Sequence, residues 1–135
     1  MANTEKELRL LVVNEQESYC ELISEQVELG DFNRQVACKC VSSEEDAKKA
    51  IADWAPTVVL VDAFLEDSNS FELMKYCNGM STPVVVTSES AVERIADSTA
   101  ERGALAYMQS EEDPESLECM LRKIIEIADN SIFYQ

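Results

Sequence analysis

Short runs of apolar residues alternate with amphipathic segments along almost the whole chain. Most of the apolar runs are nearly continuous and rich in valine or leucine, which predicts strands buried on both faces. These runs lie at 8–13, 34–41, 57–61, 83–86 and 105–108. After each run, apolar residues recur at helical spacing, which predicts helices over 15–29, 42–54, 68–78, 90–102 and 113–128. The pattern is therefore a strand followed by a helix, five times.

Several residues that begin or end helices stand where this pattern requires them. Ser42 and Glu45 have the spacing of a capping box at the start of the second helix. Asp113 followed by Pro114 is typical of the start of the last helix. Gly30 is predicted as the C′ residue of the first helix. The residues after 128 are predicted to form a short tail.

This alternation predicts an α/β protein with a (βα)5 doubly wound fold, in which helices cover both faces of a five-stranded parallel sheet. Five units are too few for a closed eight-unit barrel. We expect a single domain over 1–135, with its core over about 8–128 and a short tail at each end. The chain contains no Gly-x-Gly-x-x-Gly fingerprint, so a dinucleotide site is not expected.

The chain is strongly acidic, because 11 Lys and Arg face 27 Asp and Glu for a formal net charge of -16. Such a surface repels phosphate backbones and anionic lipids, so neither nucleic acid nor a membrane is an expected partner. The charge favours basic protein partners, or serves solubility alone. The first residues are polar and no apolar secretion signal follows, so a cytoplasmic location is expected.

The sequence contains no histidine. The commonest general base, the commonest zinc ligand and the Ser-His-Asp and Cys-His nucleophile systems are therefore excluded, and we do not expect an enzyme. The five cysteines are odd in number, which predicts buried thiols and argues against a disulfide framework. Cys38 and Cys40 would share one face of a strand. A thiolate metal site is the less favoured alternative for this pair.

Polar residues follow the predicted strands at the edge where an open parallel sheet binds its ligands. Glu15 lies just past the first strand, Asp62 ends the third, and Ser88 follows the fourth. Asp62 stands out because it directly follows an unbroken apolar run, where a carboxylate loses hydration and needs a partner or a use. Glu15 and Asp62 together could bind Mg²⁺, which prefers oxygen ligands. The alternative is that Asp62 only caps the loop that follows it.

These segments together resemble the response-regulator receiver domain, the CheY-like family, over roughly 8–128. The run LLVV precedes Asn14 and Glu15, where the family has an acidic pair. PTVVLVD ends at Asp62, in the position of the phosphoacceptor aspartate. PVVVTS ends at Ser88, in the position of a switch hydroxyl, and GALAYM contains Tyr107, in the position of a switch aromatic residue.

The resemblance implies a receiver of a two-component phosphorelay. Asp62 would accept a phosphoryl group from a histidine kinase, a phosphotransfer protein or a small phosphodonor. Mg²⁺ would be held by Glu15, Asp62, the backbone carbonyl of Phe64 and, weakly, Asn14. Phosphorylation would move Ser88 and turn the aromatic ring, which biases a two-state surface.

That surface would comprise the fourth helix, the fifth strand and the last helix, with Glu93, Arg94 and Tyr107 among its residues. We expect it to bind a downstream protein or a second copy of the chain, because no output domain is visible after 129.

The sequence departs from the family pattern at several positions of the site. Asn14 carries no charge, Ser110 stands where the family has a lysine, and Glu89 and Glu111 add negative charge nearby. A lost lysine removes a charge-assisted hydrogen bond of about 1.5–3 kcal/mol. Two interpretations therefore remain open: a phosphoacceptor switch, or an atypical receiver that is a phosphorylation-independent interaction module.

Overall fold

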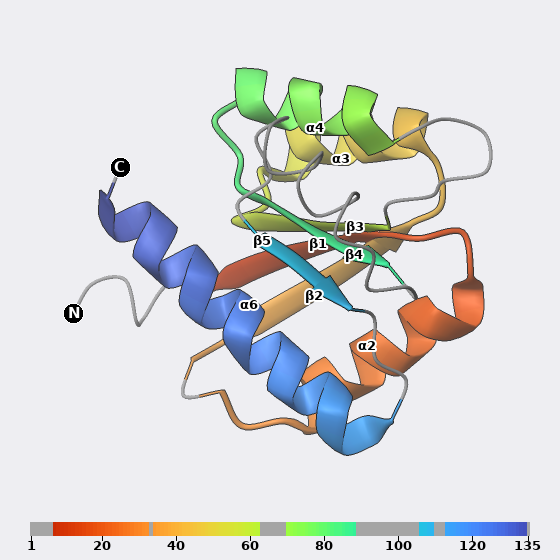
Figure 1. Cartoon of the computed structure of the whole chain (residues 1–135), viewed down its shortest axis with the longest axis vertical. Coiled ribbons are helices and arrows are strands. Elements are labelled where there is room, and N and C mark those ends of the chain that lie inside the picture. The colour runs from red at the N-terminus through yellow and green to blue at the C-terminus, as the bar shows by residue number, and fades with distance from the viewer. Residues whose placement is uncertain (1–6, 33, 63–69, 89–105, 110–112, 135) are drawn as a thin grey trace.

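The strands form one parallel sheet that runs through the middle of the protein. The computed structural model describes residues 7–32, 34–62, 70–88, 106–109 and 113–134. The strands are β1 (Leu8–Val13), β2 (Val36–Val41), β3 (Val58–Asp62), β4 (Val84–Ser88) and β5 (Ala106–Gln109). Their order across the sheet is β2-β1-β3-β4-β5, and each neighbouring pair is parallel (Figure 1).

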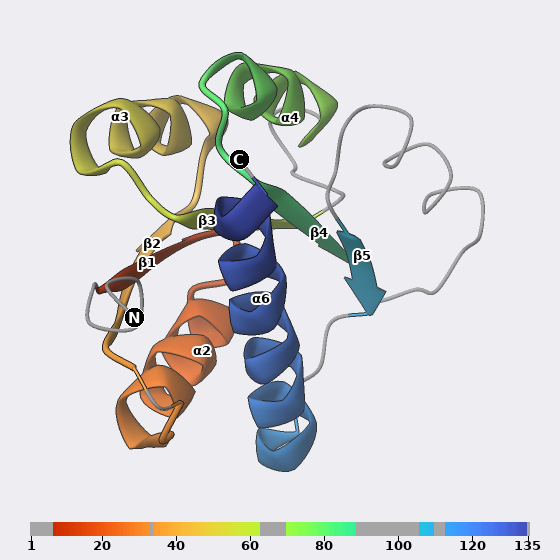
Figure 2. The same cartoon turned by 90° about the vertical axis from the view of Figure 1, so that its left-hand side faces the viewer.

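The helices cover both faces of this sheet. They are α2 (Glu17–Leu29), α3 (Glu44–Trp54), α4 (Ser70–Gly79) and α6 (Pro114–Tyr134). Figure 2 shows α2 and α6 on one face and α3 and α4 on the other. The predicted doubly wound α/β fold with a five-stranded parallel sheet is therefore confirmed. The helix predicted over 90–102 lies outside the described residues.

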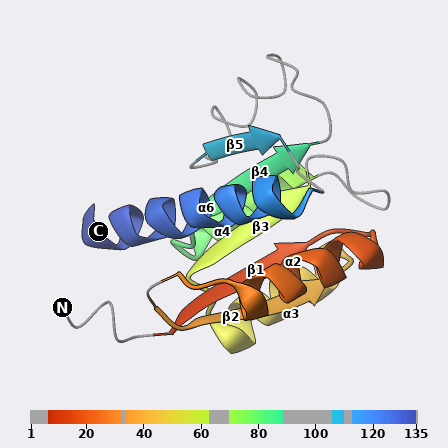
Figure 3. The ribbon, with the colours of Figure 1, turned by 90° about the horizontal axis from the view of Figure 1, so that it is seen from below.

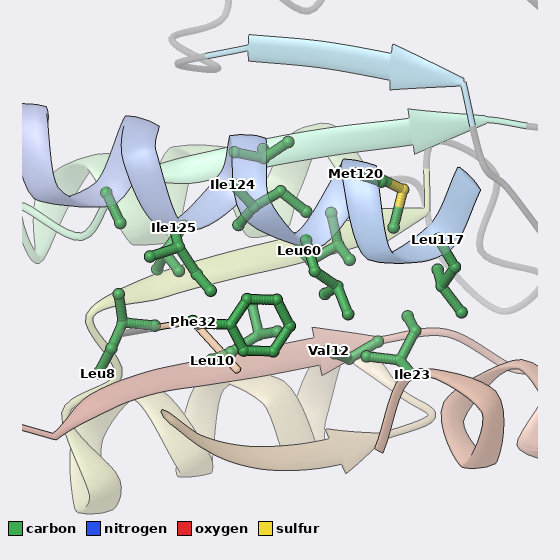
Figure 4. Packing of buried hydrophobic residues seen from close by; sticks show 14 of the residues in the cluster. Leu8, Leu10, Val12, Ile23, Phe32, Leu60, Leu117, Met120, Ile124 and Ile125 are labelled. Carbon is green, nitrogen blue, oxygen red and sulfur yellow. The ribbon is translucent and has the colours of Figure 1, made fainter. Parts of the chain in front are cut away.

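Successive residues of one strand enter two different cores, as strand alternation requires. Leu10 and Leu60 pack with Ile124 in the core beneath α2 and α6 (Figure 4). Leu11 and Val59 belong to the second core, beneath α3 and α4. Because both faces are covered, the strands need apolar side chains on both sides, which explains their nearly continuous apolar sequence.

Two helix starts test the predicted caps. The helix α3 is capped by Ser43, whose side chain accepts a hydrogen bond of 3.1 Å from the Asp46 N–H. The prediction of Ser42 was therefore wrong by one residue, because two serines stand side by side and either has capping chemistry. Asp113 is confirmed as a cap, since its carboxylate accepts a hydrogen bond of 3.3 Å from the Ser116 N–H.

The last helix continues to Tyr134, so the tail predicted after 128 was wrong. No glycine or proline occurs in 129–134 to stop it. Arg34 forms an ion pair with Asp129 of α6, and Arg122 donates a hydrogen bond of 2.9 Å to the carbonyl oxygen of Asp31. Both contacts join α6 to the connection between α2 and β2.

No helix in the described part of the chain is long and apolar enough to cross a membrane.

The strand β2 lies at one edge of the sheet and is hydrogen-bonded to β1 (Figure 3). Five of its six residues are half-buried, and Lys39 in the middle is exposed. A charged residue in the middle of an edge strand disfavours pairing with a strand of another molecule. The Lys39 ammonium also lies 5.7 Å from the centre of the Trp54 ring.

Gly30 ends α2 for a reason other than the predicted left-handed cap. Its φ is -78° and its backbone is extended, a conformation that any residue adopts. A Cβ atom at this position would lie 2.5 Å from Cε2 of the buried Phe32 ring and 2.9 Å from the carbonyl oxygen of Gln26. Space, and not conformational freedom, therefore requires glycine here.

We expect Gly30→Ala to lower the free energy of unfolding by about 1–3 kcal/mol, the usual cost of overpacking. Gly79→Ala is the matched control, because a Cβ at Gly79 meets nothing within 4 Å. The control should be neutral or stabilising by up to about 1 kcal/mol. Urea denaturation followed by circular dichroism measures both, and equal stabilities for the two variants would contradict this account of Gly30.

Candidate functional site

The sheet brings the strand ends that carry the predicted site to one edge. Val13 of β1 is in register with Val61 of β3, so Asn14 and Asp62 each follow one member of an in-register pair. On the other side, Asp62 is in register with Thr87. All the strands point the same way, and their carboxyl ends lie together (Figure 3). Glu15, Asp62 and the end of β4 therefore share one edge.

Asp62 is a half-buried carboxylate at the end of a fully buried strand. The four residues before it, Val58–Val61, are each at most 1% exposed. The central position of β3 between β1 and β4 leaves Asp62 flanked by two strand ends. Asp62 therefore stands half-buried at the carboxyl end of a central strand, the edge at which an open parallel sheet binds its ligands.

Asn14 shapes the turn that carries Glu15. The side chain is 8% exposed, and its Oδ1 accepts a hydrogen bond of 2.8 Å from the Gln16 N–H. The backbone N–H of Asn14 donates to the carbonyl oxygen of Val41 over 3.0 Å. The amide therefore organises the connection from β1 to α2, and one of its two oxygen lone pairs is already in use.

Glu15 and Asp62 are two carboxylates at this edge of the sheet that could hold a divalent cation. Glu15 is half-buried beside the end of β1, and both side chains supply the hard oxygen ligands that Mg²⁺ prefers. One or two carboxylates with bound waters suffice for Mg²⁺ in many proteins, so these residues fit the ion. Within the residues that the structure describes, no group of three or more His, Cys, Asp or Glu side chains gathers as a metal site.

Two buried hydroxyl groups end β4, Thr87 and Ser88, each 2% exposed. Val84 and Val86 face α3 and α4, whereas Val85 faces α2 and α6. Strand alternation therefore assigns Thr87 to the α2 and α6 face and Ser88 to the other.

Asp62 follows Val61, which faces α3 and α4, so it shares the face of Thr87. The resemblance to the family gives the switch position to Ser88, whereas the register places its neighbour Thr87 on the face of Asp62. The sequence contains two adjacent hydroxyl residues at this point, and only the strand register shows which of them shares the face of Asp62.

Other predicted site residues lie wholly or partly outside the described part of the chain. Phe64, Glu89, Ser110 and Glu111 are outside it. Tyr107 is described by its backbone, which lies on β5 in register with Val86.

The cysteines depart from the prediction of free thiols. The structure joins Cys20 of α2 to Cys40 of β2 in a disulfide, with their Cα atoms 6.0 Å apart. The odd number of cysteines did not exclude one bond, because Cys38, Cys77 and Cys119 are free. Burial raises the pKa of Cys77 to about 12. Burial also raises the pKa of Cys38, against a smaller opposing effect of a hydrogen bond from Ser24.

The backbone is similar to solved structures of receiver domains. The response regulator receiver domain protein (CheY-like) from Methanospirillum hungatei JF-1 superposes with a TM-score of 0.78 at 17% identity, over 96% of this chain and 100% of that one. The Francisella response regulator 1452 receiver domain gives 0.75 at 13% identity, over 92% and 98%.

The BeF3-activated DrrB receiver domain gives a TM-score of 0.70 at 20% identity, over 90% of this chain and 99% of that one. No protein-family model and no curated protein sequence matches the chain. The chain therefore has the fold of response-regulator receiver domains.

The three free thiols should react with iodoacetamide at very different rates in the native protein at about pH 8. Cys119 is exposed and should react first, whereas Cys77 should react last because its raised pKa leaves little thiolate. Peptide mass spectrometry over time measures each site, with urea-unfolded protein as the control in which the rates converge. Equal labelling of Cys77 and Cys119 in folded protein would contradict the described burial.

Proposed function

We propose that this chain is a signalling receiver domain that accepts a phosphoryl group on Asp62. The observation that supports the proposal is the position of Asp62, at the end of a buried central strand and on the edge where Asn14 and Glu15 follow the neighbouring strand. The receiver fold found in the solved structures agrees with this arrangement. The donor would be a histidine kinase or a phosphotransfer protein.

The transfer needs one nucleophilic oxygen and little else from the protein. A carboxylate oxygen of Asp62 attacks the phosphorus of a phosphohistidine or phosphoramidate donor. The P–N bond breaks, the nitrogen leaves with a proton, and an acyl phosphate forms on Asp62. Glu15 and Asp62 would hold a Mg²⁺ ion, whose charge offsets that of the phosphoryl oxygens.

A hydroxyl group at the end of β4 would then donate a hydrogen bond to the phosphoryl group. Ser88 holds this position by its resemblance to the family, whereas the register favours Thr87, which shares the face of Asp62. Tyr107 would follow this movement as the switch aromatic residue. The surface of 90–102, β5 and α6 would then bind a downstream protein or a second copy of the chain.

A second candidate function is an interaction module that works without phosphorylation. One observation favours it: the neutral Asn14 replaces a charged ligand, and its amide oxygen bonds the Gln16 N–H. In this case Asp62 would only cap the loop that follows β3. The surface that includes β5 and α6 would bind its partner in a single conformation.

Incubation with phosphoramidate and Mg²⁺ should add one phosphoryl group to the intact mass of the wild-type chain and none to Asp62→Asn. Glu15→Gln should lower the apparent Mg²⁺ affinity for this reaction by about 10-fold or more, because it removes one of two carboxylate ligands. Glu17→Gln is the matched control, since it removes a neighbouring exposed charge. No mass gain, with partner binding intact in Asp62→Asn, would favour the interaction module.

Removal of one hydroxyl should affect the phosphorylated fraction more than removal of the other. Thr87→Val keeps the shape of the side chain and should lower that fraction about tenfold, the effect of one lost hydrogen bond to a charged group. Ser88→Ala should change it less. Phos-tag electrophoresis at a fixed donor concentration measures both variants. The reverse order would return the role to Ser88 and refute the assignment from the register.

A further inference from the structure

The disulfide between Cys20 and Cys40 ties helix α2 to the edge strand β2, directly beside the segment that carries Glu15. We propose that these two cysteines form a reversible redox site, and that their oxidation state sets the position of segment 14–16. The inference concerns the disulfide and its neighbours. Only its consequence for metal binding rests on the proposed function.

Segment 14–16 is hydrogen-bonded to the elements that carry the two cysteines. On the β2 side, the Asn14 N–H donates to the carbonyl oxygen of Val41, the residue next to Cys40. On the α2 side, the Cys20 N–H itself donates to the carbonyl oxygen of Gln16 over 3.2 Å. A bond between the two sulfur atoms therefore restrains the distance between β2 and α2, the two elements to which segment 14–16 is hydrogen-bonded.

Reduction also changes which groups can donate hydrogen bonds at this place. The Cys20 Sγ lies 3.8 Å from the carbonyl oxygen of Asn14. A disulfide sulfur has no proton to give, whereas a thiol can donate weakly to this oxygen. In the reduced protein the covalent bond between α2 and β2 is lost, and the Cys20 thiol can instead donate a weak hydrogen bond to the Asn14 carbonyl oxygen. The two states hold the start of α2 by different means.

Cys20 and Cys40 both line an open groove of about 690 Å³. Liquid water occupies about 30 Å³ per molecule, so the groove has room for a small thiol. Six carboxylates surround the groove: Glu15, Glu17, Glu21, Glu25, Glu28 and Asp46. Their charge should favour neutral or cationic thiols over anionic ones.

Cys38 lies two residues from Cys40 on the same strand, and its thiol is free. Its Sγ accepts a contact of 3.8 Å from the hydroxyl of Ser24, one helical turn beyond Cys20. Burial favours its neutral thiol, which is not the nucleophilic form. The site therefore consists of Cys20 and Cys40, and Cys38 provides a matched control.

The reaction balances as thiol–disulfide exchange with a small-molecule couple. In oxidation, the two cysteine thiols and one small disulfide give the Cys20–Cys40 bond and two small thiols. In reduction, a dithiol returns two hydrogens to the cysteines and becomes a cyclic disulfide. Two electrons and two protons move in each direction, and no metal takes part.

The experiment compares oxidised and dithiothreitol-reduced wild-type chain by hydrogen exchange of the amides in 14–20. Differential alkylation and intact mass first establish that Cys20 and Cys40 exchange between disulfide and thiol. We expect these amides to exchange about tenfold faster after reduction, with far-UV circular dichroism unchanged. Cys38→Ser should behave as wild type in both states.

The double variant Cys20→Ser, Cys40→Ser should exchange at the reduced rate with or without dithiothreitol. If this variant does not fold, the reduced wild-type chain supplies the same comparison. Cysteines that stay reduced in excess small disulfide would overturn the proposal, as would exchange rates in 14–20 that agree within about twofold. A Mg²⁺ titration of both states separates the two ideas: changed exchange without Mg²⁺ binding keeps the redox site and removes the proposed metal role.

Discussion

Burial of the sheet on both faces is the constraint on which the rest of the structure depends. Helices α2 and α6 cover one face and α3 and α4 the other, so the interior of each central strand must be apolar. Polar side chains can enter the central strands only at their ends. Because the strands are parallel, those ends collect at one edge, and Asp62, Thr87 and Ser88 lie there as a direct result.

Hydrogen bonds of Asn14 also organise this edge of the sheet. The Asn14 N–H donates to the Val41 carbonyl oxygen of β2 and its side chain accepts from the Gln16 N–H, so this residue fixes the turn between β1 and α2. The same turn sets where α2 begins and where Glu15 stands. The hydrogen bonds of Asn14 therefore determine both the start of α2 and the position of Glu15, and a substitution at Asn14 should affect both.

Much of this was predictable from sequence because burial leaves a clear signal. Runs such as Val58–Val61 identify strands and fix where Asp62 must lie once the sheet is parallel. The Cys20–Cys40 bond was not predictable, because it depends on how α2 packs against β2 and no local pattern reports that distance.

The choice between Thr87 and Ser88 depends in the same way on strand register, which adjacent hydroxyl residues leave undetermined. Ser42 and Ser43 posed the same problem at a helix cap. The extension of α6 was missed for another reason, since the sequence after 128 contains no glycine or proline from which the end of the helix could be predicted.

The edge position of β2 has a mechanical consequence. A strand with one hydrogen-bonded neighbour can slide or tilt at lower cost than a central strand, since fewer ladder bonds must break together. The Cys20–Cys40 bond is attached to this edge strand, and the charge of Lys39 disfavours pairing of its outer side with a strand of another molecule. Without this bond, β2 would be held to the sheet by one hydrogen-bonded ladder and by side-chain packing, whereas β1, β3 and β4 each keep a ladder on both sides.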